Sequence, residues 1–129
     1  VKLLIAQGVH VSQARVAVLG LTFKENIPDI RNTRVVDILH ELNEFGISTT
    51  VSDPHADSEE AHHEYGLTLT PVDRLQPADA VILAVAHTDF LDRGADWFRS
   101  LSHPKHGIIV DVKGVLRRED FPDRALWRL

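Results

Sequence analysis

Apolar residues along this chain gather in short runs that amphipathic stretches separate. Three of the runs have the length and composition of central strands covered on both faces: residues 16–21, 80–85 and 108–112. A fourth run, at 47–52, is rich in β-branched residues and ends at Asp53-Pro54, where the proline turns the chain out of a sheet. Residues 67–69 predict only a weak strand.

Helical spacing of apolar residues marks the segments between these strands. The clearest helix covers 35–45, follows a cap at Asn32 or Thr33, and is closed by Gly46. Three further helical segments follow along the chain: 58–65 before Gly66, a brief turn opened by Pro71, and 90–101. The residues after 116 are charged, with scattered apolar positions, and predict no regular element.

Strands that alternate with helices are typical of an α/β protein with right-handed crossovers. We predict a Rossmann-like, doubly wound parallel sheet in three αβα layers. The loops that follow the strands of such a sheet lie at one edge, and ligands bind there. Lys24 and Arg31 follow the first strand and Lys113 follows the last apolar run, so three cations converge at this edge. The sequence thus predicts an anion site beside a helix N-terminus.

Composition narrows the function classes. The chain has 129 residues, enough for one domain, and 14 Lys and Arg against 19 Asp and Glu give a net charge of −5. This balance argues against broad binding of nucleic acid or of an anionic membrane. No apolar run could span a bilayer and no signal-peptide pattern opens the chain, so we expect a cytoplasmic protein. Cys is absent, which excludes disulfides, thiolate metal sites and thiol nucleophiles.

Other candidate sites are weaker. Gly20 does not begin a G-x-G-x-x-G dinucleotide motif, because Thr22 and Lys24 stand where glycine is needed. Asp53 could bind a ribose, but a tight exit from its strand is the preferred interpretation. The eight His show only loose zinc-like spacing, so we interpret them as solvated surface residues and expect no metal site.

The cations after the first strand also have a plain structural explanation. A lysine in a polar loop, such as Lys24, is usually solvated, and Arg31 could pair with Asp29 or Glu25. An aromatic residue beside Lys24 and a third cation at a neighbouring strand end favour a binding site instead.

Four spaced motifs resemble one protein family. In chain order they are GLTFKEN with DIRNT within 20–33, SDP at 52–54, ADA at 78–80 and DVKGVL at 111–116. Together they resemble the C-terminal domain of the nucleotide-sugar 6-dehydrogenases, which include the UDP-glucose, GDP-mannose and UDP-N-acetylhexosamine dehydrogenases. The resemblance covers residues 14–116. The DVKGVL motif and the loop at 25–29 are more similar to the UDP-N-acetylhexosamine branch.

The resemblance implies roles for individual residues. Phe23 and Lys24 would contact a UDP-sugar, with Lys24 near the sugar and the phosphates. Lys113 stands where relatives place a basic residue, often Arg, on the substrate, and lysine lacks arginine's planar fork. Arg31 would reach towards NAD bound on another domain. The family's thiolate nucleophile cannot come from this Cys-free chain, so no catalytic residue is expected here.

The same resemblance implies a domain organisation. Residues 1–14 would be the end of an interdomain helix with a linker, and 15–129 the nucleotide-sugar-binding C-terminal domain. Val1 in place of Met indicates a piece of a longer protein, whose N-terminal domain would bind NAD and whose central segment would form a homodimer. That protein would oxidise the C6 hydroxymethyl of a UDP-hexose or UDP-N-acetylhexosamine to a uronate in polysaccharide biosynthesis, and this piece alone would be inactive. The alternative is a stand-alone nucleotide-binding or assembly module without catalysis.

Overall fold

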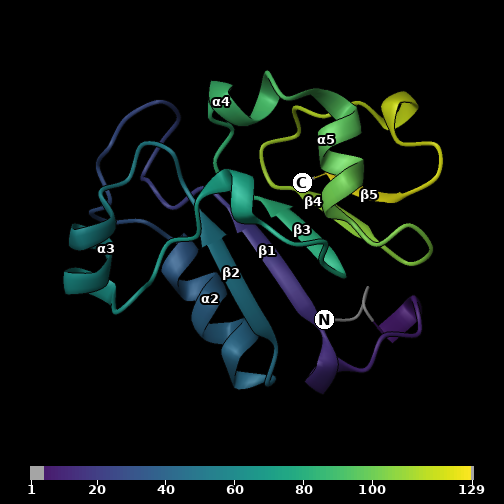
Figure 1. The fold of residues 1–129 in the computed structure, drawn as a ribbon, viewed down its shortest axis with the longest axis horizontal. Coiled ribbons are helices and arrows are strands. Elements are labelled where there is room, and N and C mark those ends of the chain that lie inside the picture. The colour runs from purple at the N-terminus through teal and green to yellow at the C-terminus, as the bar shows by residue number, and fades with distance from the viewer. Residues whose placement is uncertain (1–4, 129) are drawn as a thin grey trace.

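Five parallel strands organise the structure, a computed structural model that describes residues 5–128 (Figure 1). The strands are β1 (Arg15–Leu19), β2 (Ser48–Ser52), β3 (Ala80–Leu83), β4 (Ile108–Asp111) and β5 (Ala125–Arg128). They form one sheet in the order β2-β1-β3-β4-β5, and every pair is parallel. The predicted parallel α/β fold is therefore confirmed.

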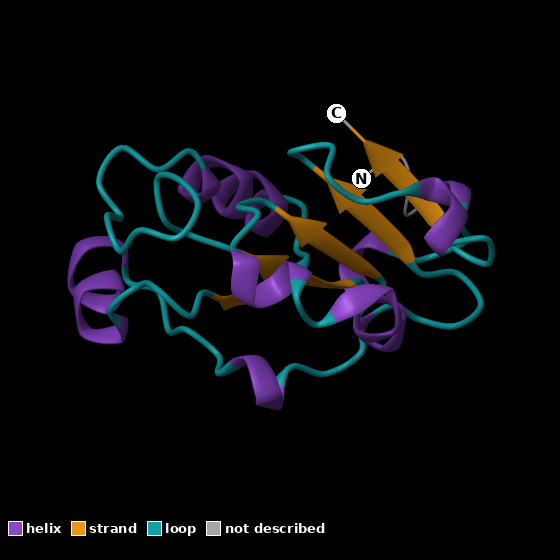
Figure 2. Ribbon diagram, turned by 90° about the horizontal axis from the view of Figure 1, so that it is seen from above, coloured by secondary structure: helices purple, strands orange, loops and turns teal. Residues whose placement is uncertain are grey.

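Helices cover both faces of the sheet (Figure 2). They are α2 (Val35–Glu44), α3 (Ser58–Tyr65), α4 (Thr88–Leu91) and α5 (Gly94–Leu101), with 3₁₀ turns at Val11–Gln13, Val72–Arg74 and Arg118–Asp120. None of these described helices is long and apolar enough to cross a bilayer. α2 buries Leu39 against one face, and α5 buries Phe98 against the other, which gives the three expected layers.

The position of β1 inside the sheet explains the unbroken apolar run at 16–19. Residues 16–19 are each at most 2% exposed. Successive side chains of a strand point to opposite faces. Val18 accordingly joins the cluster that contains Leu39 of α2, while Leu19 joins the cluster that contains Phe98 of α5. A strand covered on both faces needs apolar residues at every position, and the sequence predicts this strand for that reason.

α3 shows how local sequence sets the ends of an element. The Asp57 carboxylate accepts a hydrogen bond from the Glu60 backbone N–H at 3.0 Å, which caps the helix N-terminus. At the other end Gly66 has a φ of +68°, the left-handed conformation that closes many helices. The predicted helix at 58–65, closed by Gly66, is confirmed.

Two predicted elements differ in the structure. The helix predicted at 90–101 is divided into α4 and α5, because the chain turns after Leu91 and Gly94, the first residue of α5, has a φ of +81°. The strand predicted at 67–69 is a single bridge between Val51 and Leu69. Apolar spacing is present in both segments. The first is interrupted by its backbone conformation, and the second pairs with its neighbouring strand at one position only.

The two ends of the chain were the hardest to predict. β5 has no predicted counterpart, because at this edge strand Leu126 is buried while Trp127 remains 51% exposed, which leaves no clear alternating pattern. Residues 1–4, in the part of the chain where the end of an interdomain helix is expected, lie outside the described residues. Residues 5 and 6 are helical, and Gly8 has a φ of +80°.

Candidate functional site

The connections from β1 and β3 diverge at the carboxyl edge of the sheet. β1 leads through α2 to β2 on one side, whereas β3 lies on its other side and leads on to β4. Such a switch point is where open α/β sheets bind ligands. A cleft of about 360 Å³ lies here, between the loop after β1, the start of α2 and the ends of β3 and β4. This volume suits a small-molecule site.

Phe23 and Lys113 come together at the cleft from distant parts of the sequence. Phe23 lies in the loop after β1 and is 55% exposed, so its ring is accessible to a ligand. Lys113 follows β4 and is exposed as well. Val35, Ile38 and Val85 contribute apolar surface to the same cleft. An aromatic ring, an apolar wall and a cation are thus available to one ligand.

Arg34, which the sequence does not single out, adds positive charge beside the predicted helix N-terminus. Arg34 precedes the helix and lines the cleft beside Thr33. The first N–H groups of α2 carry the positive end of the helix dipole. Within residues 5–128, neither Arg34 nor Lys113 takes part in a salt bridge. The signal that could have identified Arg34 is a basic residue directly before a predicted helix.

A second hollow does not suit an anion. It has a volume of about 430 Å³, larger than the cleft, and lies on the flank of α2. Asp37, Glu41 and Glu44 line it. Three carboxylates repel a negatively charged ligand. The smaller cleft is therefore the better candidate for an anion site, although this hollow has the larger volume.

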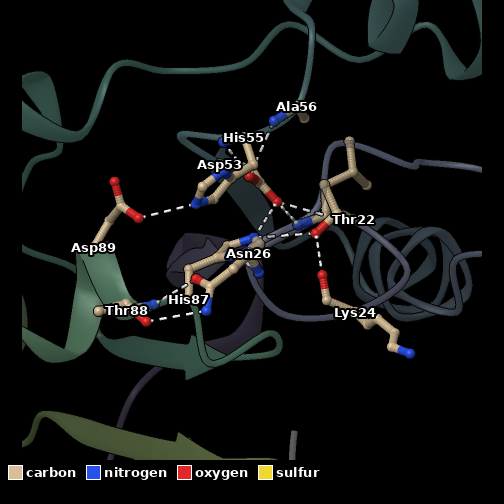
Figure 3. Close-up of polar contacts among 10 residues, drawn as sticks. Thr22, Lys24, Asn26, Asp53, His55, Ala56, His87, Thr88 and Asp89 are labelled. Atoms are coloured by element: carbon tan, nitrogen blue, oxygen red, sulfur yellow. Dashed lines mark hydrogen bonds and ion pairs between the residues drawn. The ribbon is translucent and has the colours of Figure 1, made fainter.

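Lys24 and Arg31 do not line the cleft. Lys24 is exposed, and its side chain points away from the neighbouring hydrogen-bonded cluster (Figure 3). The Arg31 guanidinium pairs with the Asp29 carboxylate through two hydrogen bonds, of 3.0 and 3.1 Å, while its side chain remains 81% exposed. These bonds lower the pKa of Asp29. The pairing of Arg31 with Asp29, one of the alternatives from the sequence, is confirmed.

Asp53 joins the end of β2 to the loop after β1. Its Oδ2 accepts hydrogen bonds from the backbone N–H groups of Leu21 and Thr22 at 2.6 and 3.0 Å. Its Oδ1 accepts from His55 and Ala56 at 2.8 and 3.1 Å, which forms the tight exit from the strand that the sequence predicts. Burial of the carboxylate disfavours its charge, but the hydrogen bonds to it outweigh burial and lower the pKa of Asp53 to about 2.

His87 corrects the interpretation of every histidine as a solvated residue. Its side chain is fully buried at the start of α4. The ring Nε2 lies 2.9 Å from Asp53 Oδ2, and Nδ1 accepts a hydrogen bond from the Asn26 backbone N–H at 2.8 Å (Figure 3). His62 and His63, in contrast, are exposed on α3 as expected. No periodic pattern indicates a contact between residues so far apart in the sequence.

Asp111 performs a similar role at the end of β4. Its buried carboxylate accepts hydrogen bonds from the backbone N–H groups of Gly114 and Leu116, at 2.9 and 2.6 Å. These bonds fold the chain back after the strand and leave Lys113 exposed at the turn. Both Phe23 and Lys113 therefore lie on loops that a buried aspartate fixes to the sheet.

Proteins of the same family match almost the whole chain. The model of the UDP-glucose/GDP-mannose dehydrogenase family, UDP binding domain, matches residues 17–118. Protein CapL of Staphylococcus aureus is 42% identical over 130 residues, which cover 100% of this chain and 30% of that protein. The UDP-N-acetyl-D-glucosamine 6-dehydrogenase of Pseudomonas aeruginosa is 46% identical over 126 residues, which cover 98% and 29%. The chain thus spans less than a third of the length of these relatives.

Solved structures share the fold. An NDP-N-acetyl-D-galactosaminuronic acid dehydrogenase from Methanosarcina mazei superposes with a TM-score of 0.84 over 98% of this chain and 26% of that one, at 22% identity. The UDP-N-acetyl-mannosamine dehydrogenase Cap5O from S. aureus gives a TM-score of 0.68 over 98% and 27%, at 25% identity.

Proposed function

The chain belongs to the UDP-glucose/GDP-mannose dehydrogenase family, and from this premise we propose that it is the UDP-sugar-binding domain of an NAD-dependent UDP-sugar 6-dehydrogenase. The whole enzyme oxidises the C6 hydroxymethyl of a UDP-N-acetylhexosamine to a carboxylate, for polysaccharide biosynthesis in the cytoplasm. The relative from P. aeruginosa, a UDP-N-acetyl-D-glucosamine 6-dehydrogenase, supports this substrate class.

The cleft at the sheet edge is the observation that carries this proposal. A diphosphate binds between Lys113, Arg34 and the N-terminus of α2, where the positive charges of the cleft gather. The exposed ring of Phe23 packs against an apolar face of the nucleotide sugar. Local cations are essential because the chain as a whole carries a net charge of −5. Beyond the cleft, Lys24 lies near the phosphates and contacts the sugar.

The same edge does not fit the pyrophosphate of NAD. Thr22 and Lys24 replace the glycines that would admit it, and the Thr22 backbone N–H is already bonded to Asp53. We therefore assign NAD mainly to a separate N-terminal domain, which residues 1–14 join to the domain at 15–129. Bound there, NAD would supply the hydride acceptor for the oxidation at C6. This chain holds the substrate, supplies no catalytic residue, and reaches towards NAD through Arg31 in a homodimeric enzyme.

Replacing Lys113 with alanine is expected to weaken UDP binding by the chain about tenfold, because one charge-assisted hydrogen bond to phosphate is lost. Isothermal titration with UDP measures the dissociation constant. Lys105→Ala is the matched control, because Lys105 is exposed in the loop before β4, at the opposite edge of the sheet. Absence of UDP binding by the unsubstituted chain would sink the proposal, and equal binding by both variants would move the site elsewhere.

Lys24→Ala is expected to weaken binding of the UDP-sugar more than binding of UDP. Because Lys24 lies outside the cleft, the dissociation constant for UDP should change less than about twofold, while that for UDP-N-acetylglucosamine should rise about fivefold. Competition titrations with the two ligands measure the ratio. An equal loss for both ligands would place Lys24 on the diphosphate alone.

Arg31→Ala is expected to change neither the stability of this chain nor its affinity for UDP, because the ion pair with Asp29 is exposed. In a protein that joins this domain to its NAD-binding domain, the same substitution should raise KM for NAD about tenfold and leave KM for the UDP-sugar unchanged. Steady-state NADH production measures both. An unchanged KM for NAD would remove Arg31 from the cofactor site.

A further inference from the structure

The loop at 20–34 is fixed through Asn26 to the start of α4. Asn26 has a φ of +62°, a left-handed conformation that asparagine tolerates better than most residues. Its side-chain oxygen accepts a hydrogen bond from the Thr88 backbone N–H at 2.9 Å, and its amide nitrogen donates to Thr88 Oγ1 at 3.0 Å. Its own backbone N–H donates to His87 Nδ1 at 2.8 Å (Figure 3). Three hydrogen bonds thus join one residue of the loop to two residues after β3.

The neighbours of His87 allow only one protonation pattern. Nδ1 faces the Asn26 backbone N–H, which can only donate, so Nδ1 must accept. Nε2 faces Asp53 Oδ2 at 2.9 Å, and a carboxylate only accepts. Nε2 also lies 3.1 Å from Thr22 Oγ1, whose proton is donated to the Lys24 carbonyl at 3.0 Å. The proton therefore lies on Nε2, and the ring is neutral.

Burial makes this pattern consequential. The side chains of His87 and Asp53 are both fully buried. Water therefore cannot replace a hydrogen-bond partner that either side chain loses. The ring joins three separate segments, because Thr22 and Asn26 belong to the loop after β1, Asp53 follows β2, and His87 follows β3. One side chain thus sets the distance between the loop and two strand ends.

We propose that His87 is a positioning residue whose neutral ring, protonated on Nε2, holds the loop at 20–34 against the ends of β2 and β3 and so sets where Phe23 stands in the cleft. The hold on the loop is independent of any ligand. The consequence for Phe23 and for binding of a UDP-sugar rests on the proposed function.

Two substitutions separate the roles of the two ring nitrogens. His87→Asn keeps an acceptor near the Nδ1 position and removes the donor to Asp53. His87→Gln keeps a donor near the Nε2 position and removes the acceptor for the Asn26 N–H. His62→Gln, at an exposed position on α3, is the matched control. Each variant is compared with the unsubstituted chain in urea unfolding, amide hydrogen exchange and titration with UDP.

The two variants should give opposite results. In His87→Gln we expect the Asn26 amide to exchange at least about tenfold faster and the dissociation constant for UDP to rise about tenfold, because the loop loses its contact with the ring. In His87→Asn we expect both quantities to stay within about twofold, even though this variant loses the donor to the buried carboxylate and is the less stable of the two. A residue that only stabilised the fold would change binding in proportion to stability.

Failure of this proposal is distinct from failure of the proposed function. Side-chain ¹⁵N spectra of the unsubstituted chain report which nitrogen of His87 carries the proton, and a proton on Nδ1 would overturn the proposal even if neither variant folds. A protected Asn26 amide in His87→Gln would overturn it as well. If the unsubstituted chain does not bind UDP, the proposed function fails, while the spectra and the exchange rates still decide whether His87 holds the loop.

Discussion

Gly20→Ala is expected to destabilise the protein by about 3 kcal/mol, because a Cβ at this position has no space and the backbone cannot adjust. Gly20 has a φ of +103°, a backbone conformation that residues other than glycine rarely adopt. An added Cβ would lie 2.6 Å from Val85 Cβ and 2.8 Å from the Val85 backbone nitrogen. The Val85 N–H donates to the Leu19 carbonyl, so β1 and β3 cannot separate without breaking that bond.

Gly46→Ala is the control for this prediction. Gly46 also has a positive φ, of +78°, but nothing lies within 4 Å of the position that a Cβ would take. Its substitution should therefore cost only about 1 kcal/mol for the strained backbone. Urea unfolding measures both free energies at neutral pH. Equal values for the two variants would show that the contact with Val85 relaxes freely.

Asp53→Asn is expected to lower the free energy of unfolding by about 3 kcal/mol at pH 7, since an amide cannot accept all the hydrogen bonds that converge on this buried carboxylate. Its NH₂ group would face backbone N–H groups instead. The loop at 20–34 would lose its contact with β2, so UDP binding should weaken along with stability. Urea unfolding and UDP titration measure the two effects.

The pH dependence of stability gives a second signature of Asp53. Its pKa is lowered from 3.8 to about 2 in the folded protein, so the ionised carboxylate favours folding. This contribution, about 2 kcal/mol, is complete above pH 4 and is lost as the pH falls to 2. The stability difference between the unsubstituted chain and Asp53→Asn should shrink by that amount over this range. Asp92→Asn, at an exposed position after α4, is the matched control substitution.

Elements with a local cause were predictable from the sequence. β1 is an apolar run because both of its faces are covered, and α3 has a capping aspartate and a closing glycine at its ends. The positions of Phe23 and Lys113 at one edge also follow from the alternation of strands and helices, because loops after parallel strands share an edge. These features depend on residues near one another in the chain or on topology alone.

Features that depend on a distant partner were not predictable. Nothing in the sequence distinguishes the buried His87 from the exposed His62. An imidazole can be buried where an aspartate and a backbone N–H from other segments face it, as they do at His87. Asp53 was assigned its local turn, but its bonds to Leu21 and Thr22 cross to another strand. β5 was missed because an edge strand needs only one buried face.

The two buried aspartates have a consequence for how this domain can be altered. Asp53 and Asp111 hold the loops that carry Phe23 and Lys113 by accepting hydrogen bonds from main-chain N–H groups, not from the side chains that face the cleft. Loop shape is therefore nearly independent of the identity of residues 23 and 113. If the proposed function holds, protein engineers could diversify position 23 to select for other nucleotide sugars while Lys113 stays in place for the diphosphate.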